Sequence, residues 1–173
     1  MAETNTSNIG FEKQIWDAAC VLRGNLDASE YKSVVLGLIF LKYISDRFEA
    51  KYQELLDEGD GFEEDKDEYT AENIFFVPEN ARWRVIAGAA HTPEIGTVID
   101  DAMRAIEQEN KRLKDILPKN FARQELDKRR LGDVVDLFTN IQMVEHGNSK
   151  DILGRTYEYC LSKFAEQEGK LAG

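Results

Sequence analysis

Apolar residues recur at the spacing of an α-helix along most of the chain. Between residues 8 and 22, one side of a helix would carry Phe11, Ile15, Ala18 or Ala19, and Leu22. Every third or fourth residue lies on the same face of a helix, so this spacing predicts an amphipathic helix. Gly24 and Asn25 predict its end.

A second, longer apolar pattern covers residues 29–56. Between Tyr31 and Ile44 nearly every face of the predicted helix is apolar, which indicates burial on several sides at the centre of the core. Asp27 and Glu30 stand at its start with the spacing of a capping box. Gly59 and the nearby Gly61 predict where it ends.

Shorter patterns follow this long helix. The apolar run 74–77 before Pro78 predicts an extended segment, either a strand or a chain pinned onto the core. Residues 79–87 predict a short helix. Thr92 and Pro93 have the order of an N-cap and a first helical residue. Three further helices are expected from there to Leu113, from Asp127 to Ile141, and from about Lys150 onward.

These elements predict an all-α protein, a helical bundle of about five main helices with at most a minor β element. Residues 1–7 are expected to form a disordered N-terminal tail, and residues 8–168 one helical domain. The longest apolar runs fall well short of the ~20 residues that a membrane span needs. The first residues also lack the pattern of a signal peptide, which predicts a cytoplasmic protein with no membrane partner.

The formal net charge of −11 argues at first against nucleic acid, because phosphates are bound by Lys and Arg. The charge is unevenly distributed, however. Residues 54–72 carry ten acids and only Lys66 as a base, whereas residues 101–130 carry nine bases and six acids. We expect the acidic segment, residues 54–72, to be a solvated loop that turns away from DNA. The composition therefore does not exclude a DNA-binding role.

No motif for catalysis, nucleotide binding or metal binding is present in the sequence. Cys20 and Cys160 lie in apolar patterns and are expected to be reduced, buried thiols. His91 and His146 have no partner at metal-ligand spacing. The pair Asp100-Asp101 is typical of an exposed helix face. We assign no catalytic, cofactor-binding or metal-binding residue.

Basic residues cluster at the start of the helix that follows Asp127. Cations in a first helical turn are disfavoured by the helix dipole, so their presence suggests an external anion. The DNA-contact hypothesis assigns phosphate contacts to Lys128, Arg129 and Arg130, with Arg123 as a further candidate. The alternative is an ordinary solvated face, or pairing of these cations with Glu125 and Asp127.

A second candidate is the tripeptide Arg82-Trp83-Arg84, in which a ring is flanked by two cations. This pattern can stack on bases or follow a nucleic-acid backbone. The interpretation that we favour is a tryptophan that anchors a loop to the core while both arginines stay outside. Candidates for contact with another domain or subunit are Trp16, Trp83 and Tyr159, because aromatic residues often anchor interfaces.

Several segments, in this order, resemble the N-terminal helical domain of the methyltransferase (M) subunit of type I restriction–modification systems. The similarity covers nearly all of the chain from about residue 8. The matching segments are Gly10–Ala19, Leu22–Asn25, Glu30–Lys32, Val35–Asp46, Phe76–Glu79, Ala81–Trp83 and Asp151–Tyr159.

In that family the helical domain precedes a catalytic domain that binds S-adenosylmethionine and methylates adenine at N6. A loop with two adjacent prolines and an aromatic ring holds the flipped base there. Pro78, Pro93 and Pro118 are isolated, so the resemblance implies an N-terminal fragment that is inactive alone. Residues 169–173 would then begin the linker to the catalytic domain.

The resemblance also implies partners. They are a specificity (S) subunit, a second M subunit, and DNA in the assembled complex, with a restriction subunit as a further candidate. The domain's implied role is to help this assembly close around DNA. The alternative is a free-standing helical module that binds a protein partner and never touches DNA.

Overall fold

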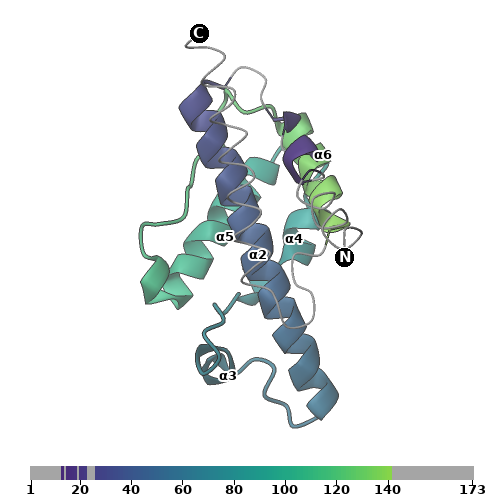
Figure 1. Ribbon diagram of the computed structural model, residues 1–173, viewed down its shortest axis with the longest axis vertical. Helices are drawn as coiled ribbons and strands as arrows, with labels where there is room; N and C mark the ends of the chain where they lie inside the picture. The colour runs from purple at the N-terminus through teal and green to yellow at the C-terminus, as the bar shows by residue number, and fades with distance from the viewer. Residues whose placement is uncertain (1–12, 14, 19, 23–25, 142–173) are drawn as a thin grey trace, which may run out of the picture.

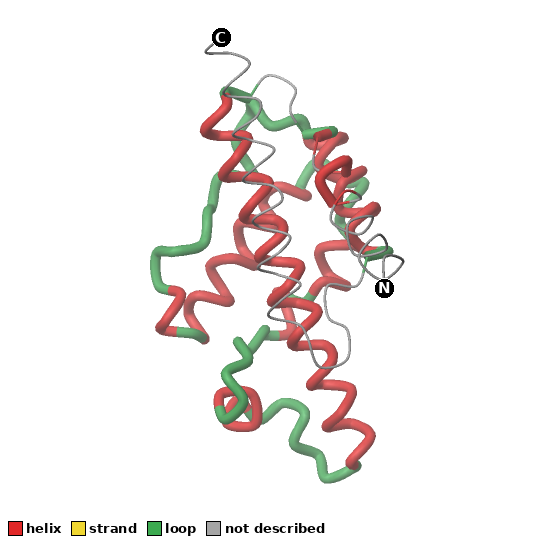
Figure 2. Tube along the Cα trace, viewed as in Figure 1, coloured by secondary structure: helices red, strands yellow, loops and turns green. Residues whose placement is uncertain are grey.

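The computed structural model describes residues 13, 15–18, 20–22 and 26–141. In these residues the chain forms helices and loops, with no strand (Figure 2). The predicted all-α class is therefore confirmed. The helix expected from Lys150 lies outside the described residues. The helices in chain order are α2 (Ala28–Glu58), α3 (Lys66–Thr70), η1 (Glu79–Ala81), α4 (Trp83–Gly88), α5 (Ile95–Glu109), η2 (Lys111–Leu113) and α6 (Lys128–Thr139).

The long helix α2 is the central element predicted from residues 29–56 (Figure 1). Its N-cap is Asp27, whose side chain accepts a hydrogen bond from the Glu30 backbone N–H at 2.9 Å. The Glu30 carboxylate pairs with Arg123 instead of completing the capping box. Gly59, with φ of 78°, ends the helix, because glycine adopts this left-handed conformation at little cost.

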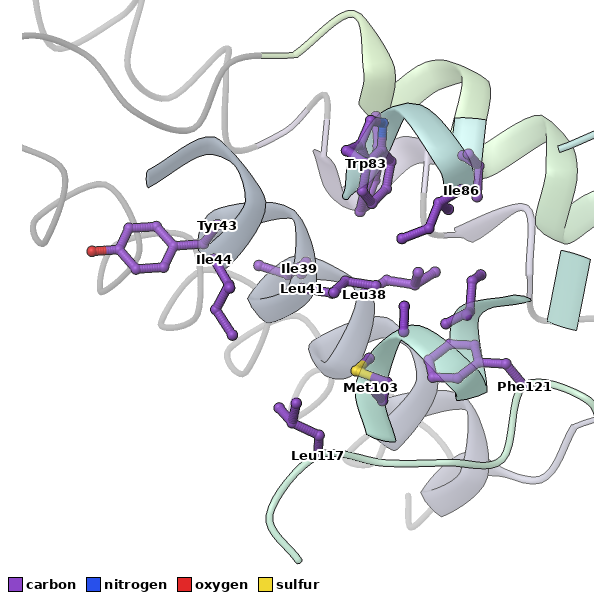
Figure 3. Packing of buried hydrophobic residues seen from close by; sticks show 14 of the residues in the cluster. Leu38, Ile39, Leu41, Tyr43, Ile44, Trp83, Ile86, Met103, Leu117 and Phe121 are labelled. Atoms are coloured by element: carbon purple, nitrogen blue, oxygen red, sulfur yellow. The ribbon is translucent and has the colours of Figure 1, made fainter. Parts of the chain in front are cut away.

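The core joins side chains from the whole described chain into one buried cluster. Figure 3 shows Leu38 and Ile39 of α2 among Trp83 of α4, Met103 of α5 and Phe121 of the loop before α6. Residues 15–18 and 20 are helical as predicted. Ile15, Trp16 and Ala18 are buried, whereas the thiol of Cys20, expected to be buried, is only partly so. Burying a side chain of the size of Ile15 contributes roughly 1.5–3 kcal/mol.

The apolar run 74–77 is a chain pinned onto the core, the second of the two predicted alternatives. The side chain of Asn110 holds it: Oδ1 accepts from the Phe76 N–H at 3.0 Å, and Nδ2 donates to the Phe76 carbonyl at 2.8 Å. Asn110 thus satisfies the backbone groups that a neighbouring strand would otherwise bind. The short helix expected at 79–87 is split into η1 and α4 at the extended residue Arg82.

Two predictions about local structure were wrong. Helix α5 begins at Ile95 without a side-chain cap, and the Thr92 hydroxyl donates to the Ala89 carbonyl at 2.8 Å, so it serves the preceding turn. The acidic segment, expected to be a loop, contains α3. Tyr69 of α3 is fully buried and stacks on Phe48 with ring centroids 4.8 Å apart, which holds this short helix on the core.

Two glycines allow close contacts that position α6. A Cβ atom on Gly96 of α5 would lie 2.2 Å from the Phe121 carbonyl oxygen, and one on Gly132 of α6 would lie 1.9 Å from that of Ala90. Any side chain at either position would therefore push the backbones apart. None of the helices in the described part of the chain has the length and apolar character needed to cross a membrane.

Candidate nucleic-acid interface

The first turn of α6 carries the basic cluster found in the sequence, and it begins at the N-cap Asp127. The Asp127 side chain accepts hydrogen bonds from the backbone N–H groups of Arg129 at 2.9 Å and Arg130 at 3.2 Å. Its carboxylate therefore satisfies the open N–H groups and offsets the positive end of the helix dipole. The external anion suggested by the sequence is not required here, because Asp127 supplies the negative charge.

Lys128 is turned back toward the loop that precedes α6. Its Nζ donates to the carbonyl oxygens of Arg123 at 2.5 Å and Leu126 at 2.6 Å. Burial lowers the pKa of the Lys128 ammonium group. The side chain thus stabilises the loop, and its hydrogen-bonding capacity is largely used inside the domain.

The same loop is held from the other side by Asp100 of α5, which is only 4% exposed. Oδ1 accepts from the Phe121 N–H at 2.9 Å, and Oδ2 accepts from the Ala122 N–H at 3.0 Å. The prediction of an exposed Asp100-Asp101 pair was wrong for Asp100 and confirmed for Asp101, which pairs at the surface with Arg104. The sequence does contain a signal for the burial of Asp100, because Asp100 shares a helix face with Gly96 and Met103.

Arg123 is engaged in two ion pairs. Its guanidinium lies 2.6 Å from Glu30 at the start of α2 and 3.3 Å from Glu125. The sequence-based alternative of pairing with Glu125 is therefore observed, and Glu30 is a partner that local spacing did not indicate. Arg123 ties the loop before α6 to α2.

Arg129 and Arg130 remain exposed on the first turn of α6. The Arg130 Nε lies 3.9 Å from Asp127, at the outer limit of an ion pair. Among the described residues no ion pair involves Arg129. These two exposed guanidinium groups, the α6 cations, are the members of the cluster best placed to bind an external anion.

The second candidate, Arg82, is buried rather than exposed. Its Nη atoms lie 3.0 Å and 2.6 Å from the Glu64 carboxylate, and its Nε donates to the Val77 carbonyl at 3.1 Å. The guanidinium carbon lies 4.8 Å from the Phe48 ring centroid and 5.1 Å from that of Tyr52. Arg82 is therefore committed to the core, which corrects the expectation that both flanking arginines stay outside.

The Glu64–Arg82 pair also changes the view of the acidic segment. Hydrogen bonds from Arg82 lower the pKa of the Glu64 carboxyl, against the opposing effect of burial. Part of the segment is thus fixed to the core and is not simply solvated. No local pattern indicates this pair, since the two residues are 18 positions apart.

Trp83 anchors its segment to the core, as the favoured interpretation predicted. It is 7% exposed, its Nε1 donates to the Thr139 hydroxyl at 2.9 Å, and Lys42 Nζ lies 5.4 Å from its ring centroid. Arg84 is exposed and forms only a surface contact of 3.3 Å with Glu79. Trp16 is buried as well, so neither tryptophan offers an open ring to a partner. Tyr159 lies outside the described residues.

The α6 cations and the acidic segment lie toward opposite ends of α2. Arg123 places the loop before α6 at the start of α2, whereas the acidic segment begins at its other end (Figure 1). A helix of 31 residues is about 45 Å long, several times the screening length at physiological salt. Across the described ranges, no group of three His, Cys, Asp or Glu residues could hold a metal ion.

The fold and these residues define a helical, charge-polarised domain whose exposed guanidinium groups suit the binding of phosphate oxygens. A family model described as the HsdM N-terminal domain matches residues 11–138. This match covers well over half of the chain, so the chain belongs to the HsdM N-terminal domain family.

Relatives of known name are similar over most of the chain. A type I restriction enzyme MjaIX methylase subunit from Methanocaldococcus jannaschii is 35% identical over 94% of this chain and 32% of its own length. A type I restriction enzyme MpnII methylase subunit from Mycoplasma pneumoniae is 24% identical over 95% of this chain and 36% of its own length. The chain thus spans about a third of the length of these relatives.

A solved structure has the same fold. The methyltransferase subunit of a type I restriction-modification system from Streptococcus thermophilus superposes with a TM-score of 0.71. The match covers 91% of this chain and 39% of that protein, at 21% sequence identity. At this level of identity the similarity concerns the fold alone.

Proposed function

We propose that this chain is the N-terminal helical domain of a type I restriction–modification methyltransferase subunit, and that it is a non-catalytic assembly and DNA-clamping module. The observation that carries the proposal is membership of the HsdM N-terminal domain family, together with relatives that are named type I methylase subunits. The parent subunit would transfer methyl groups from S-adenosylmethionine to N6 of adenine in DNA. These steps belong to regions outside this domain.

The clamping part of the proposal rests on the α6 cations. Arg129 and Arg130 are exposed, close together on one helix, and far from the acidic segment. A guanidinium group can bind a phosphate through two parallel hydrogen bonds. The partners would be a specificity subunit, a second methyltransferase subunit and DNA, with a restriction subunit joining for cleavage.

The test is charge reversal of the α6 cations in the assembled enzyme that contains the full subunit. The double variant Arg129→Glu/Arg130→Glu should bind duplex DNA carrying the enzyme's target about tenfold or more weakly. It should also flatten the dependence of log K on log salt by about one per lost phosphate contact. Equilibrium titrations at several salt concentrations measure both quantities.

The matched control is Arg129→Lys/Arg130→Lys, which keeps both positive charges and should keep most of the salt slope. Both positions are exposed, so thermal unfolding of either variant should stay close to that of the parent. An unchanged affinity and salt slope in the charge-reversed enzyme would contradict the DNA-clamping role. That result would favour a module that contacts only protein.

A further inference from the structure

A second group of cations surrounds a surface hollow at the opposite end of α5 from the α6 cations. The hollow has a volume of about 350 Å³. We call it the basic hollow, and its lining residues are Arg104, Glu107, Gln108, Lys111 and Lys114. It is separate from the start of α6, because the first residues of α6 lie against the first turn of α5, where Gly96 approaches Lys128.

The acids of α5 near the basic hollow already have partners. Asp101 pairs with Arg104 at 2.8 Å, and Glu109 pairs with Lys66 at 2.5 Å. Glu107 is bound by Lys119 at 2.6 Å and also accepts the backbone N–H of Leu117. The acids of α5 therefore do not neutralise the two lysines of the hollow.

Lys111 and Lys114 are exposed, and no ion pair in the described chain involves either of them. The neighbouring Arg112 is exposed too, and Asp115 follows directly after Lys114 in the sequence. Cations at the end of α5 are stabilised by the negative end of its dipole. This explains why cations are tolerated there, but the dipole provides them with no counter-ion.

The exposed cations of the basic segment, residues 101–130, thus lie at two places, the start of α6 and the basic hollow. Between them, Lys119, Arg123 and Lys128 are all bound to groups of this chain. Helix α5, with 15 residues, is about 22 Å long, which equals about six base-pair steps of 3.4 Å along the axis of a DNA duplex. Two separate contacts on one duplex are compatible with this spacing.

The geometry points to the basic hollow as a second binding site for backbone phosphates of DNA, with Lys111 and Lys114 as the contacting residues and Arg104 beside them. This inference rests on the proposed function, because it gives the clamp a second point of contact. The site recognises the phosphodiester and not the base, since lysine ammonium groups act as point charges without a fixed hydrogen-bonding geometry.

The experiment compares Lys111→Gln/Lys114→Gln with the parent in the assembled enzyme, again with target duplex DNA. Losing two phosphate contacts should reduce the salt slope by about two and the affinity by roughly tenfold at moderate salt. Arg112→Gln is the matched control, because it removes another exposed cation of the same segment that does not line the hollow. It should leave the slope nearly unchanged.

Several outcomes would overturn the inference. If the salt slope of the lysine double variant equals that of the parent, the hollow does not bind phosphate. If Arg112→Gln reduces the salt slope as much per lost charge as the double variant does, the effect comes from the overall positive charge and not from a site. Ile116, which is 63% exposed in the same loop, tests for a protein partner. If Ile116→Ser and the lysine variants impair subunit assembly in sedimentation while the salt slope is unchanged, the hollow serves a protein.

Failure of this inference can be distinguished from failure of the proposed function. Charge reversal at Arg129 and Arg130 tests the first contact, and the lysine variants test the second. A reduced slope for the α6 variants alone supports the clamp and overturns the second site. Because all of these side chains are exposed, melting temperatures close to that of the parent confirm that each variant is folded.

Discussion

At the scale of single residues, Arg82 shows how a charged group can be buried in this domain. A buried guanidinium is costly unless its donors are satisfied. Here three nitrogen atoms have acceptors in Glu64 and Val77, and the planar group lies over two aromatic rings. One carboxylate of the acidic segment is thereby used as a structural partner of the core.

This pairing predicts a pH-dependent contribution from Glu64. Because hydrogen bonds from Arg82 lower its pKa in the folded state, the pair stabilises the fold above the unfolded pKa of about 4.5. The contribution is lost as pH falls through the lowered folded value. Glu64 is 56% exposed, so solvent screening limits the effect to about 1 kcal/mol.

Urea unfolding of the parent and of Glu64→Gln at pH 7 and pH 3 measures this contribution. The variant should be less stable at pH 7, and the difference should shrink at pH 3. Glu79→Gln is the control, because Glu79 pairs with Arg84 entirely at the surface and should cost almost nothing at either pH. A deficit of Glu64→Gln that is the same at both pH values would count against the ion pair.

From the sequence the cation clusters could be located, but most of the groups that bind them could not. The cluster around Lys128 and the Arg82-Trp83-Arg84 tripeptide both proved to be structurally important. Whether a cation is exposed depends on groups that are remote in sequence, such as Glu64 for Arg82 and Glu30 for Arg123. Local spacing carries no information about such pairs, so Arg82 was expected to lie outside.

At the scale of elements, the apolar periodicity predicted the helices because burial of one face determines where each helix lies. The extent of α2 and the start of α6 at Asp127 were both predicted. The start of α5 was not, since Thr92 satisfies the preceding turn with the same hydroxyl that a cap would use. Contacts between elements also depend on glycines, whose role is visible only in three dimensions.

The contact between α6 and the end of α4 predicts a strong effect of a single methyl group. In Gly132→Ala the new Cβ would lie 1.9 Å from the backbone carbonyl of Ala90, so α6 must move away from its place on the core. Overpacking of this kind costs about 1–3 kcal/mol, and backbone atoms on both sides leave little room to relax. Thermal and urea unfolding should show a lower midpoint.

Gly88→Ala is the matched control at the end of α4. Nothing lies within 4 Å of a Cβ atom there, and alanine is the better helix former by about 1 kcal/mol. This variant should be as stable as the parent or slightly more stable. If the two substitutions change the unfolding midpoint equally, α6 does not pack closely on the backbone of Ala90.

At the scale of the whole molecule, the loop before α6 connects three helices. Asp100 of α5 accepts from the N–H groups of Phe121 and Ala122 in this loop, and Lys128 of α6 donates to two of its carbonyls. Arg123 within the loop pairs with Glu30 in the first turn of α2. The position of the α6 cations relative to the domain is therefore set by polar contacts as well as by the core. The sequence did not predict this arrangement, because it joins α5 to residues more than 20 positions away.

The last prediction concerns Asp100 and its neighbour Asp101, two identical residues in one helix with opposite environments. Asp100→Ala leaves two backbone N–H groups, one of them buried, without acceptors, which costs about 1–3 kcal/mol for each buried group. Asp101→Ala removes only a surface pair and should cost less than about 0.5 kcal/mol. Hydrogen exchange at Phe121 and Ala122 should accelerate in the first variant alone, because the loop opens without global unfolding. If both variants unfold alike and protection at these amides is retained, Asp100 does not hold the loop.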